Sequence, residues 1–101
     1  MANTFKSYQS TSVTTEATVL TGPASTQTTV IGLSIANTGA SAATVDVKLN
    51  TAYIVKAAPI PVGGSLVVVG GDQKVVVEAT DTLKVTSDIT VDVITSVLEI
   101  T

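Results

Sequence analysis

The sequence contains no cysteine, no histidine and no tryptophan, and all five of its basic residues are lysines. Without cysteine or histidine the chain has no disulfides, no thiolate nucleophile, no imidazole acid–base pair and none of the usual zinc ligands. Arginine is the preferred residue for phosphate groups and guanine edges, so its absence argues against nucleic-acid binding. These absences remove several large classes of enzyme and of DNA- or RNA-binding protein.

Charge and long apolar runs are also scarce. Charged residues make up 13% of the chain, against about 25% in an ordinary soluble domain, and the net charge is −3. Hydrophobic residues reach 45%, but they are divided into short pieces, none near the roughly 20 residues that a membrane-spanning helix needs. The first residues, MANTFKSY, lack the apolar core of a signal peptide. We therefore expect a soluble protein that is made in the cytoplasm and has no membrane partner.

Valine and threonine dominate what is present, and both favour strands because their branched side chains fit a pleated sheet. The clearest pattern is at Val45, Val47 and Leu49, which alternate with polar residues. Such alternation predicts a strand with one buried and one wet face. Clusters of glycine, proline, asparagine and aspartate separate about seven to nine segments of strand length. The sequence predicts an all-β fold, an antiparallel β-sandwich of the Ig-like or jelly-roll kind.

Two stretches carry more specific expectations. Pro59 and Pro61 exclude a central strand, because proline cannot donate to a ladder, and they predict an edge strand or a crossing between sheets. In residues 90–100 the apolar positions change from odd to even numbers at Thr95. This change predicts a β-bulge, or burial on both sides, in the last strand.

The beginning of the chain differs from the rest. Residues 1–12 are mostly polar, with Phe5 and Tyr8 standing out, and they predict an N-terminal arm or a weak first strand, followed by a single β-sandwich domain at residues 13–101. With Tyr53, these two are the only aromatic residues. Two alternatives stay open for them. They fill the ends of the sandwich, or Phe5 and Tyr8 anchor the arm in a neighbouring subunit, since aromatic side chains are favoured at interfaces.

Two apolar runs, LVVV at residues 66–69 and KVVV at residues 74–77, are unusual in so small a domain. Continuous runs of this kind are typical of strands that are covered on both faces, and exposed runs promote aggregation. Either these are central strands that tolerate one outward valine, or another chain covers them. The candidate partner-interface residues are therefore Val67 and Val76, together with Phe5, Tyr8 and Tyr53.

The eight acidic residues are the remaining candidates for chemistry. Three of them, Asp72, Asp81 and Asp88, fall at turns, where aspartate bonds its own backbone, and no turn offers the several carboxylates that calcium prefers. The other five are expected at wet positions inside strands, where charge discourages edge-to-edge pairing: Glu16, Asp46, Glu78, Asp92 and Glu99. The glycine pairs lack the Lys-Ser/Thr of a phosphate loop. We expect no catalytic residue, no metal site, no cofactor and no enzyme activity.

Three motifs suggest a family. They are VIGLSIAN at residues 30–37, APIPVG at residues 58–63 and SVLEI at residues 96–100. In this combination the chain resembles small β-sandwich virion structural proteins of tailed bacteriophages, notably those of marine and cyanobacterial phages. The resemblance covers most of the chain from Thr28 onward. Its motifs are structural, so it brings no site residues with it.

The resemblance implies a virion location after synthesis in the host cytoplasm, and a partner that is the major capsid protein or another virion protein. It also implies a homo-oligomer, with a trimer as the favoured form. Our leading hypothesis is a capsid decoration (cement) protein that stabilises the head, with residues 1–12 as its docking arm. The alternatives are a neck, tail or fibre component, or a receptor- or glycan-binding module, for which three aromatic residues are few.

Overall fold

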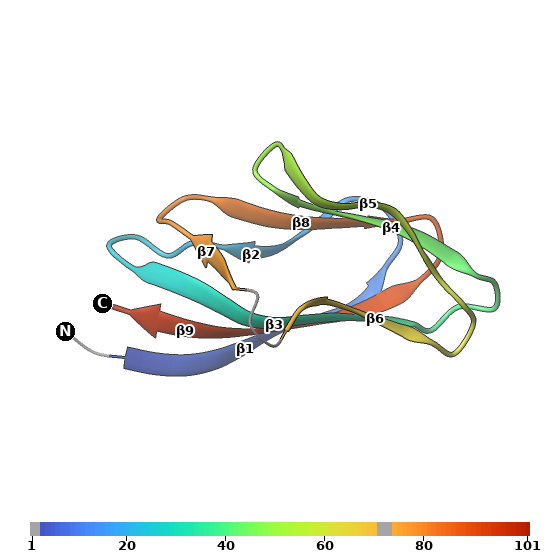
Figure 1. The fold of residues 1–101 in the computed structure, drawn as a ribbon, viewed down its shortest axis with the longest axis horizontal. Coiled ribbons are helices and arrows are strands. Elements are labelled where there is room, and N and C mark those ends of the chain that lie inside the picture. The colour runs from blue at the N-terminus through green and yellow to red at the C-terminus, as the bar shows by residue number, and fades with distance from the viewer. Residues whose placement is uncertain (1–2, 71–73) are drawn as a thin grey trace.

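The computed structural model describes residues 3–70 and 74–101, which form two β-sheets packed face to face (Figure 1). These residues contain no helix, and every strand pair is antiparallel. The strands in this part of the chain are β1 (Asn3–Val13), β2 (Ala17–Thr21), β3 (Gln27–Asn37), β4 (Ala43–Leu49), β5 (Ala52–Ile60), β6 (Ser65–Val69), β7 (Val75–Val77), β8 (Thr82–Ser87) and β9 (Val91–Ile100). The predicted all-β antiparallel sandwich is confirmed.

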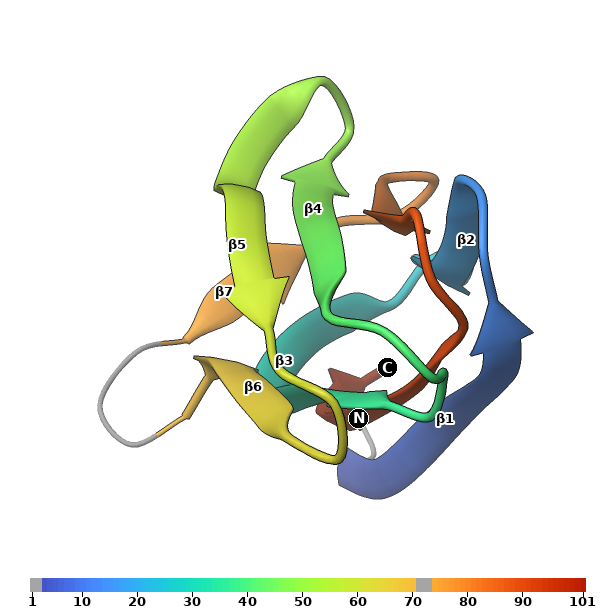
Figure 2. The ribbon, with the colours of Figure 1, turned by 90° about the vertical axis from the view of Figure 1, so that its right-hand side faces the viewer.

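The two sheets are joined by chain crossings at several places. The five-stranded sheet has the order β1-β9-β3-β6, and β7 pairs with the first part of β3 while β6 pairs with its second part. The four-stranded sheet has the order β2-β8-β4-β5. The end view in Figure 2 shows the chain passing from β1 in one sheet to β2 in the other. The molecule is elongated along its strands, with extents of 45 × 23 × 22 Å.

The core between the sheets is aliphatic. Val45 and Val47 of β4 are fully buried, as the alternation predicts, and they belong to the same hydrophobic cluster as Leu33 and Ile35 of β3. Complete burial of a side chain of this size stabilises the fold by about 1.5–3 kcal/mol. Valine supplies this burial while keeping a χ1 angle that suits an extended backbone. The core is therefore built by the same residues that make the strands.

The last strand alternates without a break. From Val91 to Glu99 every odd-numbered residue of β9 is buried, and the residues between them are half-buried or exposed. The predicted change of face in this strand is wrong, because the buried face continues through two polar residues, Thr95 and Glu99. The irregularities lie in the strands beside β9 instead: β3 carries an extra residue at Ile31, and β1 shifts register after Ser10.

Two edge strands bear on the sequence predictions. Strand β5 is an edge of the four-stranded sheet, and its Pro59 lies opposite Thr44 of β4. The prediction of an edge strand at these prolines is confirmed.

At the start of the chain, Asn3–Val13 pairs with β9 as the edge strand β1, so of the two alternatives for this segment, an arm or a first strand, the structure has the strand. A docking role for residues 1–12, and a separate domain at 13–101, stay predictions.

One close approach between loops requires glycine. The amide of Gly22 donates to the carbonyl of Asp81 at 2.8 Å, and its own carbonyl accepts from the amide of Thr80 at 3.0 Å. A Cβ atom at Gly22 would lie 2.0 Å from the carbonyl oxygen of Glu78. Asp81 shapes this turn through its carboxylate, which accepts from the amide of Glu78 at 3.1 Å. Asp72, also predicted at a turn, lies outside the described residues.

Candidate docking surface

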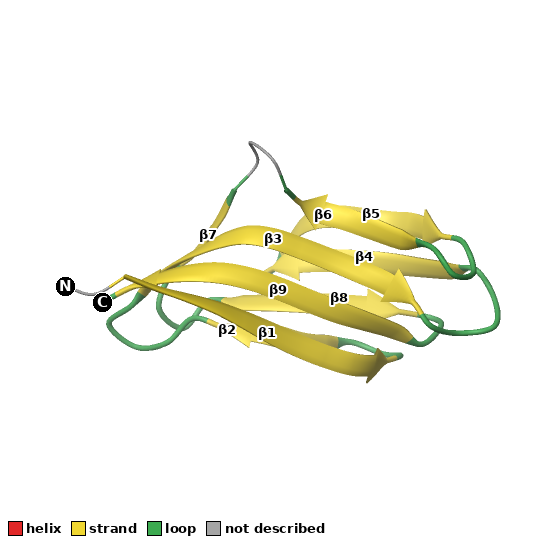
Figure 3. Cartoon of the chain, turned by 90° about the horizontal axis from the view of Figure 1, so that it is seen from below, coloured by secondary structure: helices red, strands yellow, loops and turns green. Residues whose placement is uncertain are grey.

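The outer face of the five-stranded sheet is turned toward the viewer in Figure 3, and strand register arranges its side chains in rows across the strands. The first row runs from β1 to β7 through Phe5, Leu98, Thr29 and Val76. The second row runs from β1 to β6 through Gln9, Ile94, Ser34 and Val67. Phe5 is 73% exposed, Val67 66%, Val76 55% and Ile94 48%. Four of the six large hydrophobic residues that are exposed within residues 3–70 and 74–101 therefore lie on this one face.

The residues between the two rows have small, uncharged side chains or none. Ser7, Ser96 and Gly32 lie side by side there, in register across three strands. Leu98 and Ile94 mark the two rows on β9, and four residues of strand separate them by about 13 Å. Among the strand positions of this face, only Asp92 at one end carries a charge, and its carboxylate accepts from the amide of Ser12 at 3.0 Å. We call this whole surface the outer apolar face.

The opposite surface, on the four-stranded sheet, carries the charges. Lys48 Nζ lies 2.9 Å from Glu16 Oε2, and Lys84 Nζ lies 3.9 Å from Glu16 Oε1. The hydrogen bond from Lys48 lowers the pKa of Glu16 and raises the pKa of Lys48. Glu16 lies just before β2, and Glu78 lies just after β7 of the other sheet, so the prediction that these two acids lie inside strands is wrong. The outward strand positions of this sheet include Asp46, Lys48 and Lys84, so the two faces of the sandwich differ in charge.

A shallow hollow on this charged side is lined by threonine and serine hydroxyls and by the carboxylates of Glu16, Asp46 and Asp88. Each carboxylate already has a structural partner. Asp46 accepts from the amide of Ala57 at 2.6 Å, and Asp88 accepts from the amide of Thr44 at 2.8 Å. No group of three or more metal-ligating side chains gathers anywhere in residues 3–70 and 74–101. The hollow has no aromatic residue in its lining, so it offers no platform for a sugar ring.

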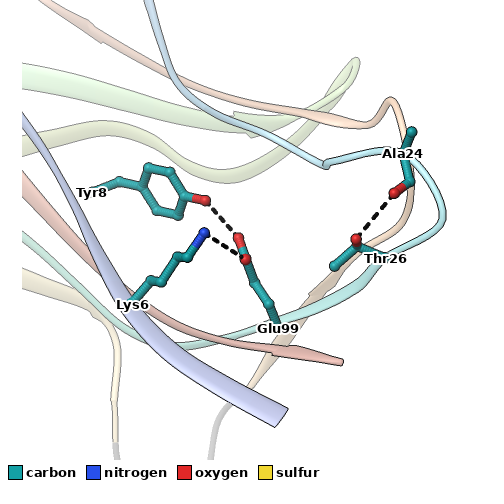
Figure 4. A network of polar contacts seen from close by, with 5 residues as sticks. All are labelled: Lys6, Tyr8, Ala24, Thr26 and Glu99. Carbon is teal, nitrogen blue, oxygen red and sulfur yellow. Dashed lines mark hydrogen bonds and ion pairs between the residues drawn. The ribbon is translucent and has the colours of Figure 1, made fainter. Parts of the chain in front are cut away.

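Glu99 contradicts the prediction of a wet position. It is 5% exposed and points into the sandwich, where the hydroxyl of Tyr8 donates to its carboxylate and Lys6 Nζ lies 3.2 Å away (Figure 4). The hydrogen bond from Tyr8 is the main cause that lowers the pKa of Glu99, and the same bond raises the pKa of Tyr8. The expectation fails because Lys6 and Tyr8, remote in sequence, reach Glu99 from β1. This network fastens β1 to β9.

The five candidate interface residues fall into two groups. Phe5, Val67 and Val76 all lie on the outer apolar face, Phe5 on the edge strand β1 and the two valines at the opposite edge, on β6 and β7. Tyr8 faces inward, and Tyr53 lies on the edge strand β5 of the other sheet, 50% exposed, with Lys56 Nζ 4.5 Å from its ring centroid. A partner contact at any of them stays a prediction. The sequence analysis missed Ile94 on this face, and the unbroken alternation from Val91 was the signal that could have found it.

No model of a known protein family matches the chain, and no curated protein matches it. Among solved structures, the fold is similar to a chain of the acidic stable capsid structure of Helicobacter pylori bacteriophage KHP30. The TM-score is 0.58 at 8% sequence identity, over 98% of this chain and 87% of that chain. At this identity the similarity shows a shared fold. Within the described residues, no helix is long and apolar enough to span a membrane.

Proposed function

We propose that this protein is a structural component of a bacteriophage virion, and more specifically a capsid decoration (cement) protein that attaches through its outer apolar face. Two independent similarities support a virion role: the sequence motifs, and the fold shared with a chain of the KHP30 capsid structure. The single observation that carries the attachment surface is that four exposed large hydrophobic side chains lie on one face of the sandwich: Phe5, Val67, Val76 and Ile94.

The physical reason is the cost of leaving this face in water. Phe5, Val67, Val76 and Ile94 each keep about half or more of their surface exposed. Since full burial of such a side chain is worth about 1.5–3 kcal/mol, covering the exposed part gives about 1 kcal/mol or more for each. Because the face is almost uncharged, attachment through it depends little on ionic strength, unlike attachment by surface ion pairs.

The proposed partners are the major capsid protein or other virion proteins, and the proposed location is the virion, after synthesis in the host cytoplasm. A homo-oligomer fits the exposed valines, and the trimer that the sequence resemblance favours stays a prediction. The structural partners of Glu16, Asp46, Asp88 and Glu99 support a non-enzymatic role. A glycan-binding role has less support, because the hydroxyl-lined hollow lacks an aromatic residue.

The test mixes purified variants with particles that lack the protein, and measures the bound fraction after sedimentation. The double variant Val67→Thr/Val76→Thr keeps the side-chain shape and replaces two outward methyl groups with hydroxyls. We expect attachment to weaken about tenfold or more. The matched control is Val62→Thr, since Val62 is 57% exposed but lies in the loop between β5 and β6. Wild-type attachment by the double variant would refute docking through this face.

A second experiment separates the places in the particle. Gold-labelled antibody against the protein, imaged on intact virions, should cover the head surface if the protein decorates the capsid. Label confined to the neck, tail or fibres would instead assign it to one of those parts while leaving the virion role intact. If substitution of Tyr53 abolishes attachment and the valine variants do not, the docking surface is the four-stranded sheet.

A further inference from the structure

The four sheet edges differ in how well they are protected against pairing with another strand. Natural proteins guard such edges with short strands, prolines, bulges or charges. Strand β5 contains Pro59 and two register shifts, and β2 has five residues and one shift. The far edge of the five-stranded sheet is divided between β6, with five residues, and β7, with three. Three of the four edges are therefore guarded.

Strand β1, with 11 residues, is the longest edge strand, and Lys6 is its one protection of this kind between Asn3 and Ser10. Its residues Asn3–Ser10 pair with β9 in unbroken register, and they include no proline. The one charge among them, Lys6, is occupied with Glu99, 3.2 Å away on the inner side of the sheet. In Figure 3, β1 runs along one margin of the molecule, and no described strand lies beyond it. A long, regular edge whose one lysine is already ion-paired within its own chain is a template for another strand.

We propose that β1 pairs edge to edge and antiparallel with β1 of a second copy of this chain, about a two-fold axis at Ser7. A second copy fits because an axis at Ser7 places Lys6 of each chain opposite Tyr8 of the other, so the lysines of the two β1 edges do not face one another. One symmetric contact also covers both open edges at once. The inference concerns the free protein and goes beyond the proposed virion role; in solution it sets a dimer in place of the trimer that the sequence resemblance favours.

The register follows from the sequence of β1. A centre at Ser7 pairs residues 4–10 of the two copies and keeps outward side chains on the outward side. A centre at Lys6 would place two lysines opposite one another, which is unfavourable. A centre at Tyr8 would draw in the irregular end of the strand, where Ser12 has a φ of 55°. The axis at Ser7 avoids both and joins the two outer apolar faces into one continuous surface.

Cysteine substitution tests this arrangement without competing thiols, because the chain has no cysteine. Residues that face each other across an antiparallel pair have Cα atoms about 4.5–5.5 Å apart, within the range of a disulfide. We expect Ser7→Cys to form a covalent dimer under mild oxidation. The matched control is Ser65→Cys, because Ser65 is exposed on the same face at the opposite edge, and we expect it to stay largely uncrosslinked.

Solution mass gives a second, independent readout. Light scattering of the wild type should show a dimer, and Ser7→Lys should convert it to monomer by placing two lysines across the axis, while Ser65→Lys should not. Circular dichroism checks that each variant is folded. A wild-type monomer or trimer, or equal crosslinking of the two cysteine variants, overturns the inference. Particle attachment of the wild type is measured separately, so a wild type that is monomeric yet attaches refutes only the dimer, and a wild-type dimer that does not attach refutes only the proposed function.

Discussion

Replacing Tyr8 with phenylalanine removes one hydroxyl and leaves the ring in place. That hydroxyl donates to Glu99, whose carboxylate is buried at 5% exposure. A hydrogen bond to a charged group is worth about 1.5–3 kcal/mol, and the remaining partner, Lys6, has an exposed side chain and contributes less, about 0.2–1 kcal/mol. We therefore expect Tyr8→Phe to lower the free energy of unfolding by about 2 kcal/mol at pH 7, which corresponds to a melting temperature lower by about 8–16 °C.

The pH dependence of this loss has a definite sign. The folded-state pKa of Glu99 lies below its ordinary value of 4.5, so its contribution is present above that pH and is lost as the pH falls through the folded pKa. The folded-state pKa of Tyr8 lies above its ordinary value of 10.0, so its contribution is lost as the pH rises beyond that value. The difference in stability between wild type and Tyr8→Phe should be greatest between these limits and shrink in acid.

Urea denaturation followed by circular dichroism at a series of pH values measures both effects. The control is Tyr53→Phe, because Tyr53 is half exposed on β5, and its change should stay within about 0.5 kcal/mol. A loss below about 0.5 kcal/mol for Tyr8→Phe at pH 7 would refute the argument that this network holds β1 to the sheet. A loss that stays the same size over the whole acid range, down to the lowest pH at which the protein is folded, would refute the assignment of the effect to ionised Glu99.

Two further predictions concern the fold. Gly22→Ala should destabilise the protein by more than about 1 kcal/mol in thermal unfolding, because its Cβ would lie 2.0 Å from the carbonyl oxygen of Glu78. An unchanged melting temperature would show that the loop at Gly22 and the turn at Glu78 can move apart at no cost. Leu83→Ala should cost about 2–5 kcal/mol, since Leu83 is fully buried between the sheets. A cost near zero would mean that the core collapses around the missing side chain.

The fold class was predictable because it depends on local pattern. Alternation at Val45 and Val47 and the prolines near residue 60 report on burial and on edge position without knowledge of the partner strand. The last strand shows the limit of this reasoning. An inward glutamate such as Glu99 breaks the apolar alternation, and the residues that make its burial tolerable, Lys6 and Tyr8, are about 90 positions away.

The outer apolar face was only partly predictable for the same reason. The valine runs pointed to Val67 and Val76, and the aromatic residue in a polar segment pointed to Phe5. Their position on one face depends on the pairing of β1 with β9 and of β3 with β6 and β7, which no single stretch of sequence specifies. The extra residue at Ile31 also sets which side chains of β3 point outward.

The most direct test of docking through the outer apolar face is the protection of single cysteines on the particle. Ser96→Cys places a thiol at the centre of the face, and Thr86→Cys places one on the outer side of the four-stranded sheet, where Thr86 is half-buried like Ser96. The rate of thiol modification is measured for each variant, free and bound to particles. Docking through the outer apolar face predicts a slower rate at Ser96→Cys on binding and an unchanged rate at Thr86→Cys. The reverse result would contradict it.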